Sequence, residues 1–284
     1  GVVDGNLTLS SVSNDLGHIG DLPVGGNIHF LSQTSTLNVT GDVLSTGGNI
    51  DLSNYYYNLQ VDSSGSVTAQ DAGSSVTLKA TTNSNNDYDA ILTGPVIAGS
   101  GGIIFQSVYG DVSTSGTGTM TTTGTVTVTS YSDDSVSIGA AVDGGTGVTV
   151  NSGGTFVNTA AINSDNGHVT IYSGKDTSTT NNYFTSVQAP ITAGDGDSVG
   201  NVSINARGTF ANTAAGTIDA TGYAKLLTWW HSSLTNQIER DLTLAGNITA
   251  GDDGIQLTSS GVINQTAGIL ATTGTVSGPS QTGG

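Results

Sequence analysis

Short alternations of apolar and polar residues recur along the whole chain, and most follow glycine or another turn residue. The copies read GNLTL at 5–9, GGNIHF at 25–30, GGNIDL at 47–52, SSVTL at 74–78, GGIIF at 101–105, GTVTV at 124–128, DSVSI at 134–138, TGVTV at 146–150, GHVTI at 167–171, GNVSI at 200–204, RDLTL at 240–244 and DGIQL at 253–257. Such period-two alternation is typical of short strands, which Gly, Asn and Asp close with tight turns. The pattern predicts an all-β protein.

The copies form an imperfect repeat, and two pairs of longer, similar segments support this interpretation. GTFVNTAAI at 154–162 resembles GTFANTAAGTI at 208–218, and PITAGDGD at 190–197 resembles NITAGDDG at 247–254. One coil of this kind cannot bury its inward Val, Ile and Leu alone, whereas stacked coils can, with their strands paired in parallel. We therefore interpret 1–284 as a single β-solenoid, a parallel β-helix. A β-sandwich built from hairpins is the alternative.

Residues 224–242 interrupt the pattern, because they contain no glycine and hold both tryptophans and the only glutamate. Leu226, Trp230, Leu234 and Ile238 are spaced four residues apart, as on the apolar stripe of an amphipathic helix. The sequence predicts an aromatic excursion over 223–241, a short helix or an ordered loop inserted in the solenoid.

The aromatic residues of this excursion are candidates for a ligand or partner contact. Trp229 lies off the apolar stripe, and Tyr223, Trp230 and His231 are its neighbours. Tyrosine and tryptophan bury large areas while keeping a polar group, and their rings suit sugar rings. The alternative is that the stripe packs back on the solenoid and needs no partner. Tyr55–Tyr57 form a similar aromatic group.

Composition narrows the range of partners. The formal net charge is −17, with 22 acidic and five basic residues, which argues against nucleic acid and against an anionic membrane surface. Cysteine is absent and no apolar run is long enough to span a membrane, so we expect no membrane insertion. The opening GVVDGN has neither an initiator methionine nor a signal stretch, as expected of a mature chain or an internal piece.

Closely spaced aspartates are the most suggestive chemical feature. The pairs are Asp87 with Asp89, Asp133 with Asp134, Asp195 with Asp197, and Asp252 with Asp253. Adjacent carboxylates can share a hard cation such as Ca²⁺, and Asp195 with Asp197 is the candidate pair for such a metal. Aspartate is also an ordinary turn residue, so turn formation is the competing explanation. No other cofactor is expected.

The remaining motifs argue against an enzyme without excluding one. His18, His29, His168 and His231 lack metal-ligand spacing, and no nucleophile motif for serine catalysis occurs. A β-helical polysaccharide lyase or hydrolase would need carboxylates with a basic residue, or two facing carboxylates. No basic residue lies beside an aspartate pair in sequence, although contacts between coils could bring them together.

Five Asn-x-Ser/Thr sequons are candidate glycosylation sites in a secreted protein. They begin at Asn6, Asn38, Asn201, Asn247 and Asn264. Several are expected by chance in a chain so rich in Asn and Thr.

The motifs GGNIHF, GGNIDL, GHVTI and GNVSINARGTFANTAAGTIDATG resemble the repeat region of filamentous haemagglutinin-like exoproteins, secreted adhesins of the two-partner route. The resemblance implies a right-handed β-helical shaft, a secreted or cell-surface location, and a role in adhesion or biofilm. The Asn-Pro-Asn motif of the family's export domain is missing, which favours a stretch of shaft.

We therefore expect a non-enzymatic shaft or repeat segment of a cell-surface adhesin, which mediates attachment or assembles into extracellular filaments. Its expected partners are other copies of itself, neighbouring segments of a longer chain, and host or matrix carbohydrate. A carbohydrate-active enzyme on the same scaffold is the alternative.

Overall fold

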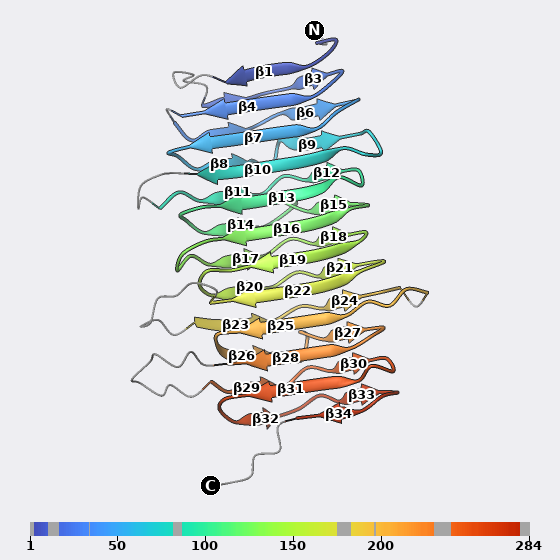
Figure 1. Ribbon diagram of the computed structural model, residues 1–284. Helices are drawn as coiled ribbons and strands as arrows, with labels where there is room; N and C mark the ends of the chain where they lie inside the picture. The colour runs from blue at the N-terminus through green and yellow to red at the C-terminus, as the bar shows by residue number, and fades with distance from the viewer. Residues whose placement is uncertain are drawn as a thin grey trace.

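The computed structural model describes residues 3–10, 17–33, 35–81, 87–174, 183–195, 197–229 and 240–278. Within these ranges the chain forms strands and their connections, and no helix. The strands make three parallel sheets that run along one axis, from the first strands at one end to the last at the other (Figure 1). The fold is a β-solenoid, which confirms the parallel β-helix that the alternation predicts.

Each coil contributes one strand to each sheet, in a fixed order. The long-strand sheet comprises β1 (Leu7–Ser10), β4 (Ile28–Ser32), β7 (Ile50–Tyr55), β10 (Ser75–Thr81), β13 (Gly102–Ser107), β16 (Thr125–Ser130), β19 (Gly147–Asn151), β22 (His168–Ser173), β25 (Val202–Ala206), β28 (Ala224–Thr228), β31 (Ile255–Ser259) and β34 (Val276–Ser277). The second sheet comprises β2 (His18–Ile19), β5 (Leu37–Val39), β8 (Leu59–Val61), β11 (Ala90–Leu92), β14 (Val112–Thr114), β17 (Val136–Ile138), β20 (Phe156–Asn158), β23 (Tyr183–Val187), β26 (Gly208–Asn212), β29 (Leu242–Leu244) and β32 (Ile263–Gln265). The third sheet comprises β3 (Leu22–Val24), β6 (Asp42–Ser45), β9 (Ser66–Ala69), β12 (Val96–Ala98), β15 (Met120–Thr122), β18 (Val142–Gly144), β21 (Ile162–Ser164), β24 (Ile191–Ala193), β27 (Ile218–Ala220), β30 (Ile248–Ala250) and β33 (Leu270–Thr272).

The inward-facing residues of the three sheets form one core in which equivalent residues lie above one another. In the long-strand sheet, Val126 pairs with Val148 and Val148 with Val169, and all three side chains are fully buried. Burying such a side chain contributes roughly 1.5–3 kcal/mol relative to leaving it in water. Each coil therefore gains its stability from the coils above and below it.

Three corners join the sheets within a coil. The first corner leads from the long-strand sheet to the second sheet, the second corner from there to the third sheet, and the third corner back to the long-strand sheet. At the third corner Asn6 Oδ1 accepts the backbone N–H of Asn27 at 2.8 Å, and Asn27 Oδ1 accepts that of Asn49 at 2.8 Å. We call this row the asparagine ladder.

The asparagine ladder explains the recurring Gly-Gly-Asn motif. A Cβ atom at Gly26 would lie 2.4 Å from Asn6 Oδ1, and one at Gly48 would lie 2.5 Å from Asn27 Oδ1. Real side chains do not approach this closely, so only glycine leaves room for the amide of the preceding coil.

The first part of the expected excursion over 223–241 is regular strand. Residues Ala224–Thr228 form β28, a regular member of the long-strand sheet, and Leu226 is fully buried in the core. The helical spacing of Leu226 with Trp230 is therefore misleading, because Leu226 faces the solenoid interior as a strand residue. Residues 230–239 lie outside the described ranges.

The repeat copies also divide between two sheets. Ten of the twelve copies match strands of the long-strand sheet, whereas 134–138 and 240–244 contain β17 and β29 of the second sheet. Every sheet alternates inward and outward residues, so the alternation alone cannot assign a strand to its sheet. The later spacings of the copies are uneven because none of the twelve copies contains β28 and because these two copies belong to the second sheet.

Candidate functional site

Aromatic side chains gather at the first corner. Eight of the nine tyrosines lie in a first-corner connection or within two residues of one, and Trp229 directly follows β28 at the same corner. We call this set the tyrosine edge; its tyrosines are Tyr55, Tyr56, Tyr57, Tyr88, Tyr109, Tyr131, Tyr172 and Tyr183. The spacing of Tyr88, Tyr109 and Tyr131 matches one coil each, which is the signal that sequence reasoning missed.

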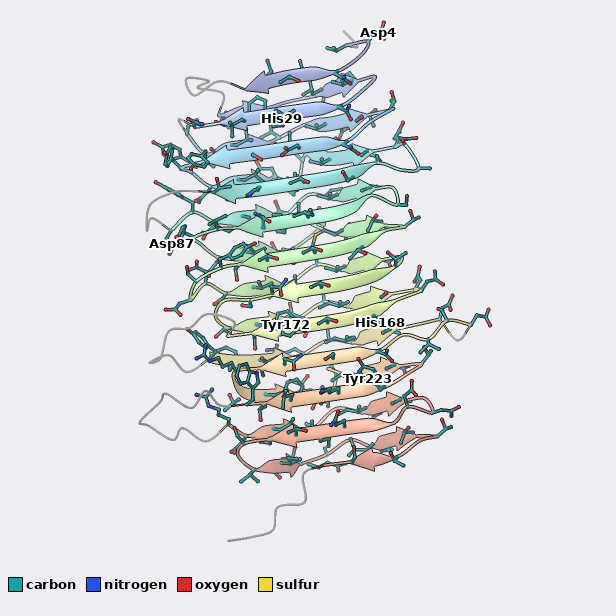
Figure 2. All side chains as sticks on the ribbon, in the orientation of Figure 1. Asp4, His29, Asp87, His168, Tyr172 and Tyr223 are labelled. Carbon is teal, nitrogen blue, oxygen red and sulfur yellow. The ribbon has the colours of Figure 1, made fainter. Side chains whose placement is uncertain are left out.

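The first corner also has the most variable connections. They range from residue 207 alone to residues 229–241, whereas the third-corner connections range from two residues, as at 123–124, to residues 194–201. Asp87, which belongs to one of these connections, lies at the left side of the solenoid in Figure 2. Insertions at a corner leave the strand ladders intact, so this edge can vary without loss of the fold.

Backbone conformation sets the tyrosine edge apart as well. In the described part of the chain, positive φ outside glycine occurs at Tyr56, with φ 89°, and at Ser132, with φ 55°. Both residues lie in first-corner connections. Side chains other than glycine rarely adopt this region, and such residues concentrate at functional sites.

A cleft of about 390 Å³ opens on this edge. Three successive coils form its lining: Val108 and Tyr109 from one, Thr129 to Ser132 from the next, and Gly153 from the third. Tyr131 is 48% exposed, so its ring is available to a ligand. The cleft combines aromatic surface with hydroxyl groups, a mixture common in small-ligand sites.

Carboxylates surround the tyrosines. Asp89 Oδ1 accepts the Asp111 N–H at 2.9 Å, and Asp111 Oδ1 accepts the Ser135 N–H at 2.7 Å. Asn58 begins this row by accepting the Asp89 N–H at 2.9 Å. We call the row the aspartate ladder. Burial raises the pKa of Asp89, and the charges of Asp111 and Asp87 raise it further against the hydrogen bond from Asp111.

Asp134 is the most perturbed carboxyl of the edge. Its pKa is raised to about 6, mainly by burial and further by the charges of Asp87, Asp111 and Asp133, while the Gly110 N–H that donates to its Oδ2 at 2.7 Å opposes the shift. The hydroxyl of Tyr183 donates to Asp133 Oδ1. Keeping these carboxyl groups ionised therefore lowers the stability of the fold. Carboxyl groups with perturbed pKa values are common at functional sites, so this corner is a candidate site.

The predicted contact residues do not converge. Tyr223 precedes β28 and Trp229 follows it, so they lie at opposite ends of a strand that spans roughly 16 Å. Tyr223 is at the third corner, where its N–H donates to Asn201 Oδ1 at 2.8 Å, and in Figure 2 it lies away from the edge that carries Asp87. Trp230 and His231 lie outside the described residues.

Trp229 belongs to the tyrosine edge and is 41% exposed. Its N–H donates to the Ala206 carbonyl at 3.1 Å, and its carbonyl accepts Arg240 Nη1 at 3.4 Å. Arg240 is buried, and its burial, followed by the positive charge of Arg207, lowers the pKa of its guanidinium. The backbone of Trp229 is thus fixed while its ring stays accessible.

Asp195 and Asp197, the candidate metal pair, form a turn. Asp195 Oδ1 accepts Ser198 Oγ at 3.0 Å and the Asp197 N–H at 3.2 Å, and these bonds lower the pKa of Asp195. This geometry is that of the turn explanation. Among the described residues, no three His, Asp or Glu side chains gather closely enough to hold a metal ion.

The sequon asparagines have different environments. Asn6, Asn201 and Asn247 use their Oδ1 atoms to accept N–H groups of the next coil, from Asn27, Tyr223 and Ile269. Asn264 is exposed on β32, whereas Asn38 on β5 is half-buried, and its Oδ1 has no hydrogen-bond partner. Exposed Asn6, Asn247 and Asn264 are therefore the more accessible acceptors.

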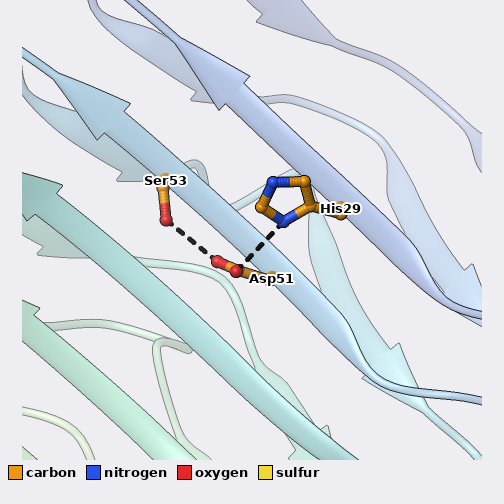
Figure 3. Close-up of polar contacts among 3 residues, drawn as sticks. All are labelled: His29, Asp51 and Ser53. Carbon is orange, nitrogen blue, oxygen red and sulfur yellow. Dashed lines mark hydrogen bonds and ion pairs between the residues drawn. The ribbon is translucent and has the colours of Figure 1, made fainter. Parts of the chain in front are cut away.

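One histidine hydrogen-bonds to a carboxylate on the outer face of the long-strand sheet. His29 Nδ1 lies 3.1 Å from Asp51 Oδ2, and Ser53 Oγ donates to Asp51 Oδ1 at 2.9 Å (Figure 3). The serine bonds to the aspartate rather than to the imidazole, so the histidine does not activate it as a nucleophile. His168 Nδ1 accepts the Asn201 N–H at 3.1 Å, which is a structural role.

Comparisons with family models, curated proteins and solved structures find no match for this chain. No helix that could cross a membrane occurs in the described ranges. The class of protein that the fold defines is therefore a three-sheet parallel β-solenoid with an aromatic and acidic edge.

Proposed function

We propose that this chain is a non-enzymatic shaft or repeat segment of a secreted cell-surface adhesin, which mediates attachment or assembly into extracellular filaments. The observation that carries the proposal is the continuity of the three sheets, which pass through every described coil without a break. Parallel ladders along one axis give a stiff rod, and side chains at its corners are free to make contacts.

The last described coil supports assembly along the axis. Val276, Ile263 and Leu270 take inward positions there and pair with buried residues of the preceding coil, yet Val276 is 52% exposed and the other two are only partly buried. Another solenoid coil stacked on this end would cover them and pair the open strand edges. The partner would be a second copy or a neighbouring segment of a longer chain.

The acidic surface supports a role outside the cell. A net charge of −17 keeps a long rod soluble and separated from other rods, and the absence of cysteine makes folding independent of redox conditions. A secreted or cell-surface location follows from this role as part of the proposal, as does participation in a biofilm matrix.

Electron microscopy of the purified native protein tests the shaft. We expect rods or continuous filaments, and fibre diffraction from aligned material should give a meridional spacing of about 4.8 Å from the stacked coils. Isolated compact particles that do not associate over a hundredfold range of concentration would contradict assembly. Cells whose attachment is unchanged after loss of the chain would contradict the adhesin role.

A carbohydrate-active enzyme is the second candidate, and Asp134 is the observation that favours it. A carboxyl with a pKa of about 6 beside other carboxyls is a feature of glycoside hydrolases, in which one group acts as the acid and another as the base or nucleophile. Release of reducing ends from a polysaccharide, lost in Asp134→Asn, would establish this function and overturn the proposal. We expect no release.

A further inference from the structure

We propose that the cleft between Tyr109 and Tyr131 binds a neutral hexose polysaccharide, with the chain of sugars running along the tyrosine edge. The inference rests on the proposed attachment role, for which it supplies the contact site and the class of ligand.

The size and lining of the cleft fit sugar rings. Its volume of about 390 Å³ falls at the lower end of small-ligand sites, which span roughly 300–1,000 Å³. The C–H faces of a hexose pack on aromatic rings, and Tyr131 offers a ring that is half exposed. Ser132, which also lines the cleft, adds a residue with a hydrogen-bonding side chain next to Tyr131.

The backbone around Tyr131 is held in place before any ligand arrives. Ser132 has positive φ, and the Asp134 N–H donates to the Tyr131 carbonyl at 3.3 Å across the turn. A Cβ atom at Gly153 would lie 1.6 Å from the Ser132 carbonyl oxygen, so the next coil closes directly against this turn. A preorganised turn avoids the entropy cost of ordering it on binding.

Charge decides which polysaccharides fit. Asp111, Asp133 and Asp134 lie beside the cleft residues, and Asp134 accepts the Gly110 N–H next to Tyr109. These carboxylates can accept hydrogen bonds from sugar hydroxyls but repel uronic acids and sulfated sugars. The ligand class is therefore neutral rather than anionic.

The regular stacking of the coils sets the direction in which a bound polysaccharide would run. Tyr88, Tyr109 and Tyr131 follow one another on successive coils, which are about 4.8 Å apart. This spacing is close to the length of one sugar residue in an extended polysaccharide. The Tyr57 and Tyr88 rings, with centroids 5.7 Å apart, continue the row of aromatic surface toward the first coils.

Affinity electrophoresis tests the proposal with four soluble probes: a β-glucan, a mannan, a galactan and polygalacturonate. We expect at least one neutral probe to retard the native chain and polygalacturonate to leave its migration unchanged. The double variant Tyr109→Ala/Tyr131→Ala should bind at least roughly tenfold more weakly, as for aromatic contact residues elsewhere. Tyr131→Phe should retain most of the affinity because it keeps the ring.

Tyr223→Ala is the matched control, because Tyr223 is the one tyrosine away from this edge. The proposal is overturned if no neutral probe retards the native chain, if polygalacturonate is the probe that binds, or if the double variant and Tyr223→Ala behave alike. Electron microscopy of the double variant separates the two hypotheses. Intact rods of the double variant that have lost glycan binding would support the binding site. Native rods that bind no neutral probe would reject the binding site alone, whereas the absence of rods from the native protein would reject the shaft.

Discussion

The asparagine ladder and the aspartate ladder both provide hydrogen-bond acceptors for backbone N–H groups, the first with amide oxygens and the second with carboxylate oxygens. In each, the residue just before a strand uses a side-chain oxygen to accept a backbone N–H of the next coil, at 2.8 Å for Asn27 and 2.9 Å for Asp89. The amide of asparagine is neutral, so its row can be extended freely. The carboxylates of Asp89 and Asp111 repel each other, and the pKa of Asp89 is raised.

The charge of the aspartate ladder distinguishes the first corner, which is the candidate binding site, from the third corner, where the neutral asparagine ladder stabilises the fold. Asparagine would satisfy the same N–H without charge, as Asn58 does for Asp89 at the start of the aspartate ladder. Aspartate at the first corner is therefore not explained by the ladder alone. The same corner holds the tyrosines, the cleft and the longest connection, which supports the proposal that its residues make contacts outside the solenoid.

Of the changes to the two ladders, breaking the asparagine ladder is expected to have the larger effect. Asn27→Ala removes the acceptor for the Asn49 N–H and the bond from Asn27 Nδ2 to Asn6 Oδ1. Two lost hydrogen bonds should lower the free energy of unfolding by about 1–2 kcal/mol, measured by chemical denaturation. Asn166→Ala, at an exposed asparagine of the same corner, should cost less than half of this amount, and an equal cost would refute the role of the ladder.

The asparagine ladder also shows what sequence reasoning could reach. The alternation specifies strands, and stacking follows because single coils cannot bury their apolar residues, so the solenoid was predictable. The Gly-Gly-Asn motif marked the third corner, although its reason, the clearance between Gly48 and Asn27 Oδ1, needs coordinates.

The site was less predictable, because it depends on which residues become neighbours between coils. Tyr88, Tyr109 and Tyr131 are far apart in sequence and meet only when the length of each coil is known. The tryptophan segment is more conspicuous in the sequence, because its composition is unusual. In that segment the strand β28 is hard to recognise. Its outward-facing residues are Lys225 and Leu227, and the apolar residues of the segment are also spaced as in a helix.

A smaller effect is expected from converting the aspartate ladder into an asparagine ladder. Asp89→Asn keeps an oxygen for the Asp111 N–H and removes the repulsion between the two carboxylates. We expect the variant to be more stable at pH 7 by about 0.5 kcal/mol in chemical denaturation. Asp219→Asn, at an exposed carboxyl of β27, is the control and should change stability less. A destabilised Asp89→Asn variant would show that the charge itself supports the fold.

The dependence on pH has a definite sign. A carboxyl with a raised pKa in the folded chain binds its proton more tightly there than in the unfolded chain, so stability falls as pH rises. For Asp134 this loss extends from about pH 4, the ordinary aspartate range, to about pH 6, and it stays under roughly 1 kcal/mol because the half-exposed group is screened by water. The advantage of Asp89→Asn should therefore shrink when the denaturation is repeated near pH 4.

The smallest effect on stability is expected at the residue that matters most for the proposed binding. Tyr131 is 48% exposed and lines the cleft, so Tyr131→Ala should change the free energy of unfolding by less than about 0.5 kcal/mol. Tyr183, on the same edge, is buried and bonded to Asp133, and Tyr183→Ala should cost about 3 kcal/mol or more. If the two variants lose stability equally, Tyr131 supports the fold. If Tyr131→Ala is as stable as the native chain but loses glycan binding, the tyrosine edge keeps its exposed rings for a ligand.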